Sequence, residues 1–214
     1  MQITTYGHCC LLIELAGKRV LTDPGTFSSG FEDLTDIDLI LITHEHADHL
    51  HTEALQALIE QNPGVHVVTN GSVGKILAEL EIPSAVLAHE QKEQVAGIHL
   101  KAYDGPHEEI FEEFGLVQNT GFLLEHGEFF YPGDSYIVPI ESVNVLAAPV
   151  AGPWCKVANA IRYVLKVAPK TMIPVHDAGL SKAGKAVVYP HFERELMKQN
   201  ITFTALKSGE TVEL

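Results

Sequence analysis

Hydrophobic residues follow two patterns along this chain, short continuous or alternating runs and longer stretches with helical spacing. The short runs are rich in branched side chains and predict strands, whereas the helical spacing predicts amphipathic helices. Strands are predicted at residues 2–5, 9–15, 18–22, 38–42, 65–68, 85–88, 94–103, 121–125, 128–131, 143–147, 171–174, 202–206 and 211–214. Helices are predicted at residues 52–61, 72–80, 156–168 and 190–199.

The order of these elements predicts an α/β (α+β) fold with two β-rich halves. Strands dominate the beginning and the middle of the chain, and helices alternate with short strands after each group. Helices on the outside of two sheets would give a four-layer αββα sandwich. The chain has 214 residues and no linker or low-complexity stretch, so we expect a single domain over residues 1–214.

A dense cluster of potential metal ligands comes directly after the apolar run at residues 38–42. The cluster, in the segment THEHADHL, comprises His44, His46, Asp48 and His49. His44 and His46 are two residues apart, so in an extended chain they point to the same side and can share one ion. Four donors within six residues do not readily converge on one tetrahedral ion. The cluster therefore predicts two metal ions, each with further ligands from elsewhere.

Two other interpretations of the cluster fit less well. The thermolysin-type motif H-E-x-x-H is excluded, because Asp48 stands where the second histidine is required. A helix-capping aspartate among surface histidines would leave four polar residues unexplained directly after a buried strand.

The spacing H-x-H-x-D-H resembles the signature of the metallo-β-lactamase superfamily and matches it at every required position. The resemblance implies the αββα fold and three more ligands downstream, in a fixed order. The candidates, each after a strand-like run, are His107 in YDGPHEE, Asp134 in YPGDS and His176 in IPVHDAG. The implied arrangement has one ion on His44, His46 and His107, a second on Asp48, His49 and His176, and Asp134 between them.

His107 has two competitors nearby in the sequence. His99 lies inside an alternating strand pattern and His89 in a polar turn, so neither stands at the expected end of a strand. His107, which follows a Gly-Pro turn, is therefore the preferred ligand.

Two residues near the N-terminus are candidates for supporting roles at the metals. A ligating histidine usually donates its other ring N–H to a carboxylate or a carbonyl. Asp23, in LTDPG, is the best candidate for such a carboxylate, and it also fits a turn-forming Asp-Pro-Gly. The resemblance implies that His8, in YGHCC, approaches the metals as a pocket or catalytic residue.

The resemblance implies a hydrolase in which metal-bound hydroxide, oriented by Asp48, cleaves an ester, lactone or phosphodiester bond of a small molecule. Two Zn²⁺ ions are expected, although Mn²⁺ or iron would suit the same ligands. The segments GHCCLLIE, LTDPG, PGDS, APVAGPW and IPVHDAG resemble the small hydrolases related to ascorbate-phosphate lactonase. The alternatives are an iron-dependent oxidoreductase of the same fold, similar to sulfur dioxygenases, and a non-catalytic metal-binding protein.

Residues for substrate contact are less clearly indicated. The candidates are Trp154, Lys156 and His191. Trp154 could equally be a residue that packs in the core, and Lys156 could be a solvent-exposed residue in the first turn of a helix. The segment at residues 108–114 alternates glutamates with aromatic residues, which favours a solvated amphipathic turn over a lid.

Charge and composition restrict the partners. A formal net charge of −14 with only 14 lysines and arginines disfavours nucleic acid, which needs basic clusters. No apolar run reaches the roughly 18 residues of a membrane span, and no signal peptide is apparent, so we expect a cytoplasmic protein. The three cysteines suggest neither a disulfide framework nor a thiolate zinc motif. A small-molecule substrate is expected, and a homo-oligomer remains open.

Overall fold

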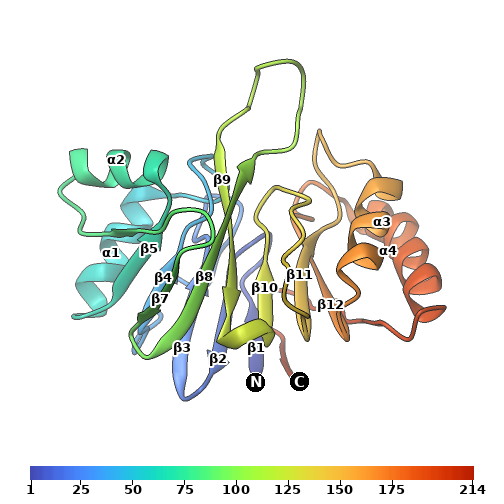
Figure 1. Cartoon of the computed structure of the whole chain (residues 1–214), viewed down its shortest axis with the longest axis horizontal. Helices are drawn as coiled ribbons and strands as arrows, with labels where there is room; N and C mark the ends of the chain where they lie inside the picture. Colours follow the sequence, from blue (N-terminus) through green and yellow to red (C-terminus); the bar gives the residue numbers. More distant parts are fainter.

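The computed structural model describes residues 1–214 and consists of two seven-stranded sheets with helices on both outer faces (Figure 1). The first sheet has the order β14-β1-β2-β3-β4-β5-β6. Its strands are β1 (Gln2–Thr5), β2 (Leu11–Leu15), β3 (Lys18–Thr22), β4 (Leu39–Leu41), β5 (His66–Thr69), β6 (Ala85–Val86) and β14 (Thr211–Glu213). The prediction of an αββα sandwich is confirmed.

The second sheet has the order β13-β12-β11-β10-β9-β8-β7. Its strands are β7 (Lys92–Val95), β8 (Ile98–Pro106), β9 (Gln118–Leu124), β10 (Phe129–Tyr131), β11 (Val145–Pro149), β12 (Thr171–Val175) and β13 (Thr202–Phe203). A short 3₁₀ turn, η1 (Glu125–Gly127), joins β9 to β10.

Three hydrophobic cores hold the four layers together. The core between the sheets takes Leu11 and Ile13 of β2, whereas Leu12 points into the core beneath the helices. This burial on both faces explains why the central strands are continuously apolar. Helices α1 (Thr52–Gln61) and α2 (Gly71–Glu79) cover the first sheet, and α3 (Val157–Val167) and α4 (Lys182–Met197) cover the second (Figure 1).

Two predicted elements differ most from the structure in their extent. The strand predicted at residues 94–103 is a hairpin of β7 and β8, with Val95 opposite Ile98. Ala96 and Gly97 form its turn with positive φ angles of 52° and 91°, the conformation that two-residue hairpin turns require. Helix α4 begins at Lys182 rather than at Pro190, because the Ser181 hydroxyl caps it by accepting a bond from the Gly184 N–H.

Several strands end at the same edge of the sandwich. In the first sheet β3 and β4 run parallel, and in the second β10, β11 and β12 run parallel to one another. Strand β8 shares their direction, because β8 and β10 are both antiparallel to β9. The loops after these strands therefore gather at one edge, near the base of the projecting β8–β9 loop (Figure 1). None of the four helices is both long and apolar enough to cross a bilayer.

Candidate metal centre

The loops at this edge bring together all seven residues that the sequence suggests as metal ligands. Each ligand or ligand cluster follows the end of a strand: the 44–49 cluster after β4, His107 after β8, Asp134 after β10 and His176 after β12. Most of these side chains are buried, with His44 and His49 fully inaccessible. Short loops after strand ends thus position donors that lie far apart in the sequence.

The first group of donors consists of three histidines. One ring nitrogen from each of His44, His46 and His107 lies within 4.8 Å of the others. The His44 and His46 rings are edge-to-face with centroids 4.8 Å apart, and the His46 and His107 centroids are 4.6 Å apart. Three imidazoles that converge in this way can hold one transition-metal ion.

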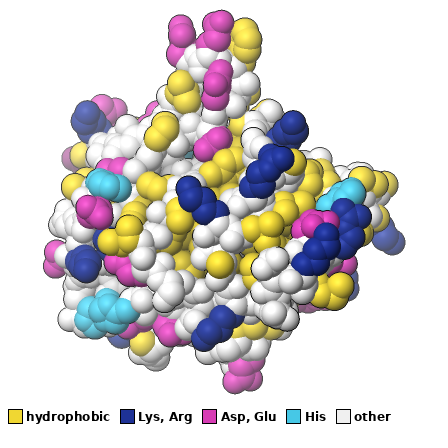
Figure 2. Space-filling view, turned by 45° about the vertical axis from the view of Figure 1, so that its right-hand side comes forward, with side chains coloured by type: hydrophobic (Ala, Val, Ile, Leu, Met, Phe, Trp, Pro, Cys, Tyr) yellow, Lys and Arg dark blue, Asp and Glu magenta, His cyan; other side chains and the backbone are white.

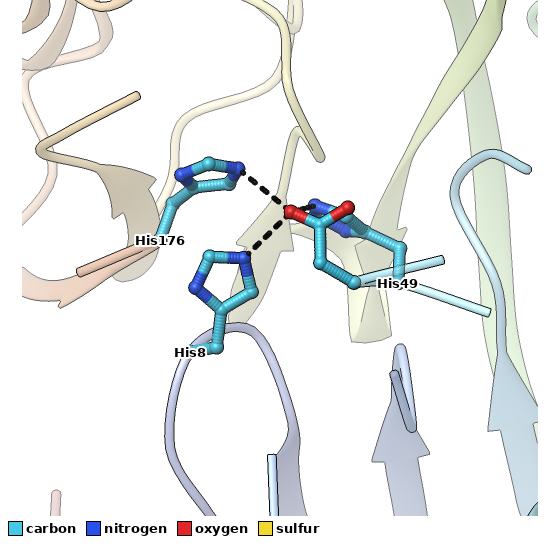
Figure 3. A group of neighbouring side chains, drawn as sticks. His8, His49 and His176 are labelled. Carbon is cyan, nitrogen blue, oxygen red and sulfur yellow. Dashed lines mark hydrogen bonds and ion pairs between the residues drawn. The ribbon is translucent and has the colours of Figure 1, made fainter. Parts of the chain in front are cut away.

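The second group is formed around one oxygen of Asp48. His8, His49 and His176 point toward this carboxylate from three different segments (Figure 3). The distances from Asp48 Oδ2 are 3.0 Å to His8 Nε2, 3.5 Å to His176 Nε2 and 3.8 Å to His49 Nε2. The group is suited to a second ion, and it contains His8 in addition to the three ligands expected there.

Asp134 lies between the two groups. Its Oδ2 is 3.2 Å from His107 Nε2 and 3.9 Å from His44 Nε2 on one side, and 2.8 Å from His176 Nε2 on the other. Its Oδ1 is 3.3 Å from His49 Nε2. One buried carboxylate therefore reaches both groups, as a bridging ligand between two cations would have to.

Hydrogen bonds on the far side of three rings fix which nitrogen is free. His49 Nδ1–H donates to Asp23 Oδ2 at 2.7 Å, and His107 Nδ1–H donates to the Glu108 carbonyl at 2.7 Å. Thr43 Oγ1 donates its own proton to Asp23, so it accepts from His44 Nδ1–H at 3.0 Å. In all three histidines Nε2 is consequently the nitrogen that faces the site and that a metal would take in place of a proton.

Apart from Arg19 Nε, the buried side-chain atoms left without a hydrogen bond belong to residues of this site. They include His44 Nε2, His49 Nε2 and Asp134 Oδ1, all of which face the space between the two groups. Leaving buried polar atoms unpaired costs roughly 1–3 kcal/mol each. Imidazole nitrogens and carboxylate oxygens are suitable ligands for zinc, manganese or iron. The residues present therefore fit a pair of metal ions.

The electrostatics of the site favour positive charge. Burial would lower the pKa of His176, but the nearby Asp134 and Asp48 carboxylates together outweigh it and raise that pKa to about 9. Burial would likewise lower the pKa of His49, yet Asp134 and Asp23 raise it well above its usual value. The carboxylates that favour protons on these rings also favour metal cations in the same position.

The backbone is strained where it presents these side chains. His8, Asp23 and His176 have φ angles of 49°, 34° and 59°, which residues other than glycine rarely adopt. Such strain is common at functional sites. Gly25 allows a close approach, because a Cβ there would lie 1.9 Å from the Asp48 carbonyl oxygen.

Three supporting residues were not foreseen from the sequence. Thr43 holds Asp23 through its backbone N–H at 2.8 Å and through its hydroxyl, and the Tyr131 hydroxyl donates to Asp23 at 2.6 Å. Asn119 Oδ1 accepts from the Asp134 N–H at 3.0 Å, and its amide donates to the Pro132 carbonyl. Thr43 directly precedes the cluster, which is a usable signal, but nothing in the sequence indicates Asn119.

Other candidates lie away from the centre. His99 is exposed and groups with Glu125 and His126 beside a separate cavity, and His89 is exposed. Lys156 and His191, considered for substrate contact, are exposed and do not line the cavity over the metal centre. Both stand on or beside the outer helices, where α3 and α4 turn them to solvent. Trp154 does line the cavity.

We predict that His107→Ala empties the first site preferentially, whereas His99→Ala leaves the metal content unchanged. His107 is buried against Asp134, and His99 is not part of either donor group. Elemental analysis of the two purified variants tests this prediction. A loss of metal from His99→Ala, with His107→Ala fully loaded, would move the ligand to His99.

Comparisons with known proteins agree with this architecture. The family model described as a β-lactamase superfamily domain matches residues 2–176. Protein Rv0786c of Mycobacterium tuberculosis is 36% identical over 193 residues, which cover 88% of this chain and 90% of that protein. A UPF0173 metal-dependent hydrolase of Pyrococcus abyssi is 24% identical in an alignment of 233 positions, gaps included, which covers all of both chains.

Solved structures show the same fold at low sequence identity. Igni18, a metallo hydrolase from Ignicoccus hospitalis, superposes with a TM-score of 0.78 at 17% identity, covering 99% of this chain and 97% of that one. CmlA, a diiron β-hydroxylase from Streptomyces venezuelae, has a TM-score of 0.78 at 18% identity and covers all of this chain and 54% of that one.

These similarities support the superfamily and its metal-dependent hydrolases. They do not identify the branch related to ascorbate-phosphate lactonase. The resemblance expected from the H-x-H-x-D-H spacing is confirmed at the level of the superfamily. The chain belongs to the β-lactamase superfamily, and it has the fold of that superfamily's metal-dependent hydrolases.

Proposed function

We propose that this protein is a dinuclear metal-dependent hydrolase of a small molecule, cleaving an ester, lactone or phosphodiester bond. His44, His46 and His107 would hold one ion, Asp48, His49 and His176 the other, and Asp134 would bridge them. The position of Asp134 carries the proposal, because its two oxygens contact histidines of both groups within a buried space. Zinc is the proposed metal.

The chemistry that two such cations supply when bound is Lewis acidity, which activates water near neutral pH and polarises a carbonyl or phosphoryl oxygen. Asp48 is half-buried and lines the cavity above the site, so its carboxylate can accept a hydrogen bond from an attacking water and orient it. Asp23 keeps the His49 ring in place through the hydrogen bond to Nδ1.

His8 is proposed to position Asp48. Burial lowers the pKa of His8, so its ring is neutral near pH 7. Because a carboxylate only accepts, the neutral ring must donate Nε2–H to Asp48 Oδ2, at 3.0 Å. This bond leaves Asp48 Oδ1 free and fixes the direction of the carboxylate.

We expect His8→Ala to retain both metals while kcat falls roughly tenfold, in the range found when a partner of a metal ligand is lost. His8→Gln, whose amide can still donate to Asp48, should recover part of the rate. Metal analysis and steady-state kinetics on both variants provide the test. Loss of one metal equivalent in His8→Ala would instead make His8 a ligand.

An iron-dependent oxidoreductase is the second candidate function. It is favoured by one specific observation, the close structural similarity to a diiron β-hydroxylase. The donor set of histidines and carboxylates suits iron as well as zinc.

Hydrolysis by metal-stripped and reloaded protein distinguishes the two candidates. The protein would be stripped with a chelator, reloaded separately with Zn²⁺, Mn²⁺ and Fe²⁺, and assayed against aryl esters, lactones, thioesters and phosphodiesters. Hydrolysis that returns with Zn²⁺ or Mn²⁺ supports the first function. Absence of hydrolysis with every metal, together with oxygen consumption by the iron-loaded protein, would favour the second.

A further inference from the structure

A cavity of about 650 Å³ opens over the metal centre, and its walls differ sharply from its floor. The floor is formed by the histidines and carboxylates described above. The walls are mainly apolar and include Phe27, Ile110, Phe114, Trp154 and Leu180. A reacting group at the metals would therefore lie beside apolar surface on several sides.

The cavity contains no lysine or arginine. Its only ionisable side chains besides the histidines are Asp48 and Asp134, both at the floor. The β8–β9 loop above adds exposed glutamates at positions 109, 112 and 113. Sites for phosphate or carboxylate groups usually provide arginine or lysine as a partner. A negatively charged substituent extending away from the metals would find no such partner and would be repelled by these glutamates.

Trp154 forms a rigid part of the wall. Its ring packs edge-to-face on His107 and on His176, with centroid distances of 5.6 and 5.5 Å, so it spans both donor groups. Gly152 leaves room for this packing, because a Cβ there would lie 3.1 Å from Trp154 Nε1. An aromatic face is consequently fixed next to the position of the reacting bond.

A second part of the wall comes from the β8–β9 loop, which projects beyond the sandwich (Figure 1). Its tip carries acidic and hydrophobic side chains together (Figure 2). Ile110 and Phe114 line the cavity, although Phe114 is 70% exposed. The glutamates are solvated, as an amphipathic turn predicts, but the apolar side of the loop is turned toward the site. Phe27, 59% exposed, completes the mouth and packs edge-to-face on His8.

We infer that the cavity takes an uncharged ligand with an apolar or aromatic substituent, held between Trp154 and Phe114. Resting on the proposed function, this assigns an uncharged ester or lactone as the substrate class, in preference to a phosphodiester. In the reaction, the oxygen of water forms a bond to the carbonyl carbon, and the bond from that carbon to the leaving oxygen breaks. The leaving oxygen takes up a proton from that water, which yields an acid and an alcohol, joined in one molecule when the substrate is a lactone.

Trp154 is the only tryptophan of the chain, so its fluorescence reports on binding without any reaction. The probes are phenylacetohydroxamate and its 4-carboxy derivative, which share a metal-binding head and differ at the far end of the ring, where the second probe carries a carboxylate. With metal-loaded protein, we expect the uncharged probe to bind at least tenfold more tightly. Equal or tighter binding of the 4-carboxy probe would overturn the inference.

Phe114 and Phe111 form a matched pair on the same loop. They are 70% and 68% exposed, but only Phe114 lines the cavity. Phe114→Ala should weaken binding of the uncharged probe several-fold, and Phe111→Ala should not change it. Phe114→Lys should reduce or reverse the preference against the 4-carboxy probe, whereas Phe111→Lys should leave the preference intact. Equal effects at the two positions would contradict the proposed binding mode.

Hydrolysis assays distinguish a failure of this inference from a failure of the proposed function. Across 4-nitrophenyl esters from acetate to butyrate, kcat/KM should rise by up to roughly fourfold for each methylene that becomes buried. Faster hydrolysis of bis(4-nitrophenyl) phosphate than of the butyrate ester would overturn the ester assignment and leave the hydrolase in place. Hydrolysis of neither compound, with the probe preferences as expected, would contradict the hydrolase and leave the apolar cavity established.

Discussion

Replacement of Asp134 by alanine is expected to remove one or both metal ions and to abolish hydrolysis. Asp134 is buried and contacts histidines of both donor groups, so its loss leaves the two cations without the charge that offsets their repulsion. The fall in kcat/KM should exceed the roughly 10- to 100-fold that follows loss of a residue that only orients a ligand. Elemental analysis and steady-state kinetics on the purified variant measure both effects.

Glu45→Ala is the matched control, because Glu45 lies inside the same cluster in sequence but belongs to neither donor group and does not line the cavity. It should keep its metals and most of its activity. Equal metal content in the Asp134→Ala and Glu45→Ala proteins would sink the assignment of Asp134 as a bridge.

Replacement of Asp23 by alanine should weaken the second metal site and destabilise the fold together. Asp23 is fully buried and accepts hydrogen bonds from His49, from the backbone and hydroxyl of Thr43, and from Tyr131. Its loss leaves several buried donors unpaired, so the free energy of unfolding should fall by about 3 kcal/mol or more. Metal affinity at the second site should fall roughly 10- to 100-fold.

Tyr131→Phe provides the graded comparison, because it removes only one of these hydrogen bonds and should cost about 1 kcal/mol. Urea denaturation and competition with a metal chelator give the two readouts. If Asp23→Ala were as stable as Tyr131→Phe and bound metal equally well, the proposed role of Asp23 in supporting the second metal site and the fold would be contradicted.

The local parts of this structure could be predicted from the sequence. The helix at residues 52–61 agrees with α1 in both ends, and the strand before the ligand cluster agrees with β4 within one residue at each end. Their patterns depend on neighbouring residues, which the sequence displays directly. The predicted extent of α4 is wrong, because Pro190 fits a helix start in the sequence although the helix is capped at Ser181.

The distant parts of the site required a family pattern or the structure itself. His107 and His176 are single histidines, and only their order after the H-x-H-x-D-H segment pointed to them. Tyr131 lies 108 residues from Asp23 in the sequence, and their contact depends on how the two sheets pack. The sequence indicates Trp154 as a candidate for substrate contact, but it does not show that Phe114 lines the same cavity from a loop after a different strand.

The metal content of active protein, purified without added metal, tests the central claim most directly. Elemental analysis should find about two equivalents of zinc or manganese per chain, and ester hydrolysis should disappear when they are removed and return when they are restored. One equivalent or none in fully active protein, or two equivalents of iron without any hydrolysis, would contradict a dinuclear metal-dependent hydrolase.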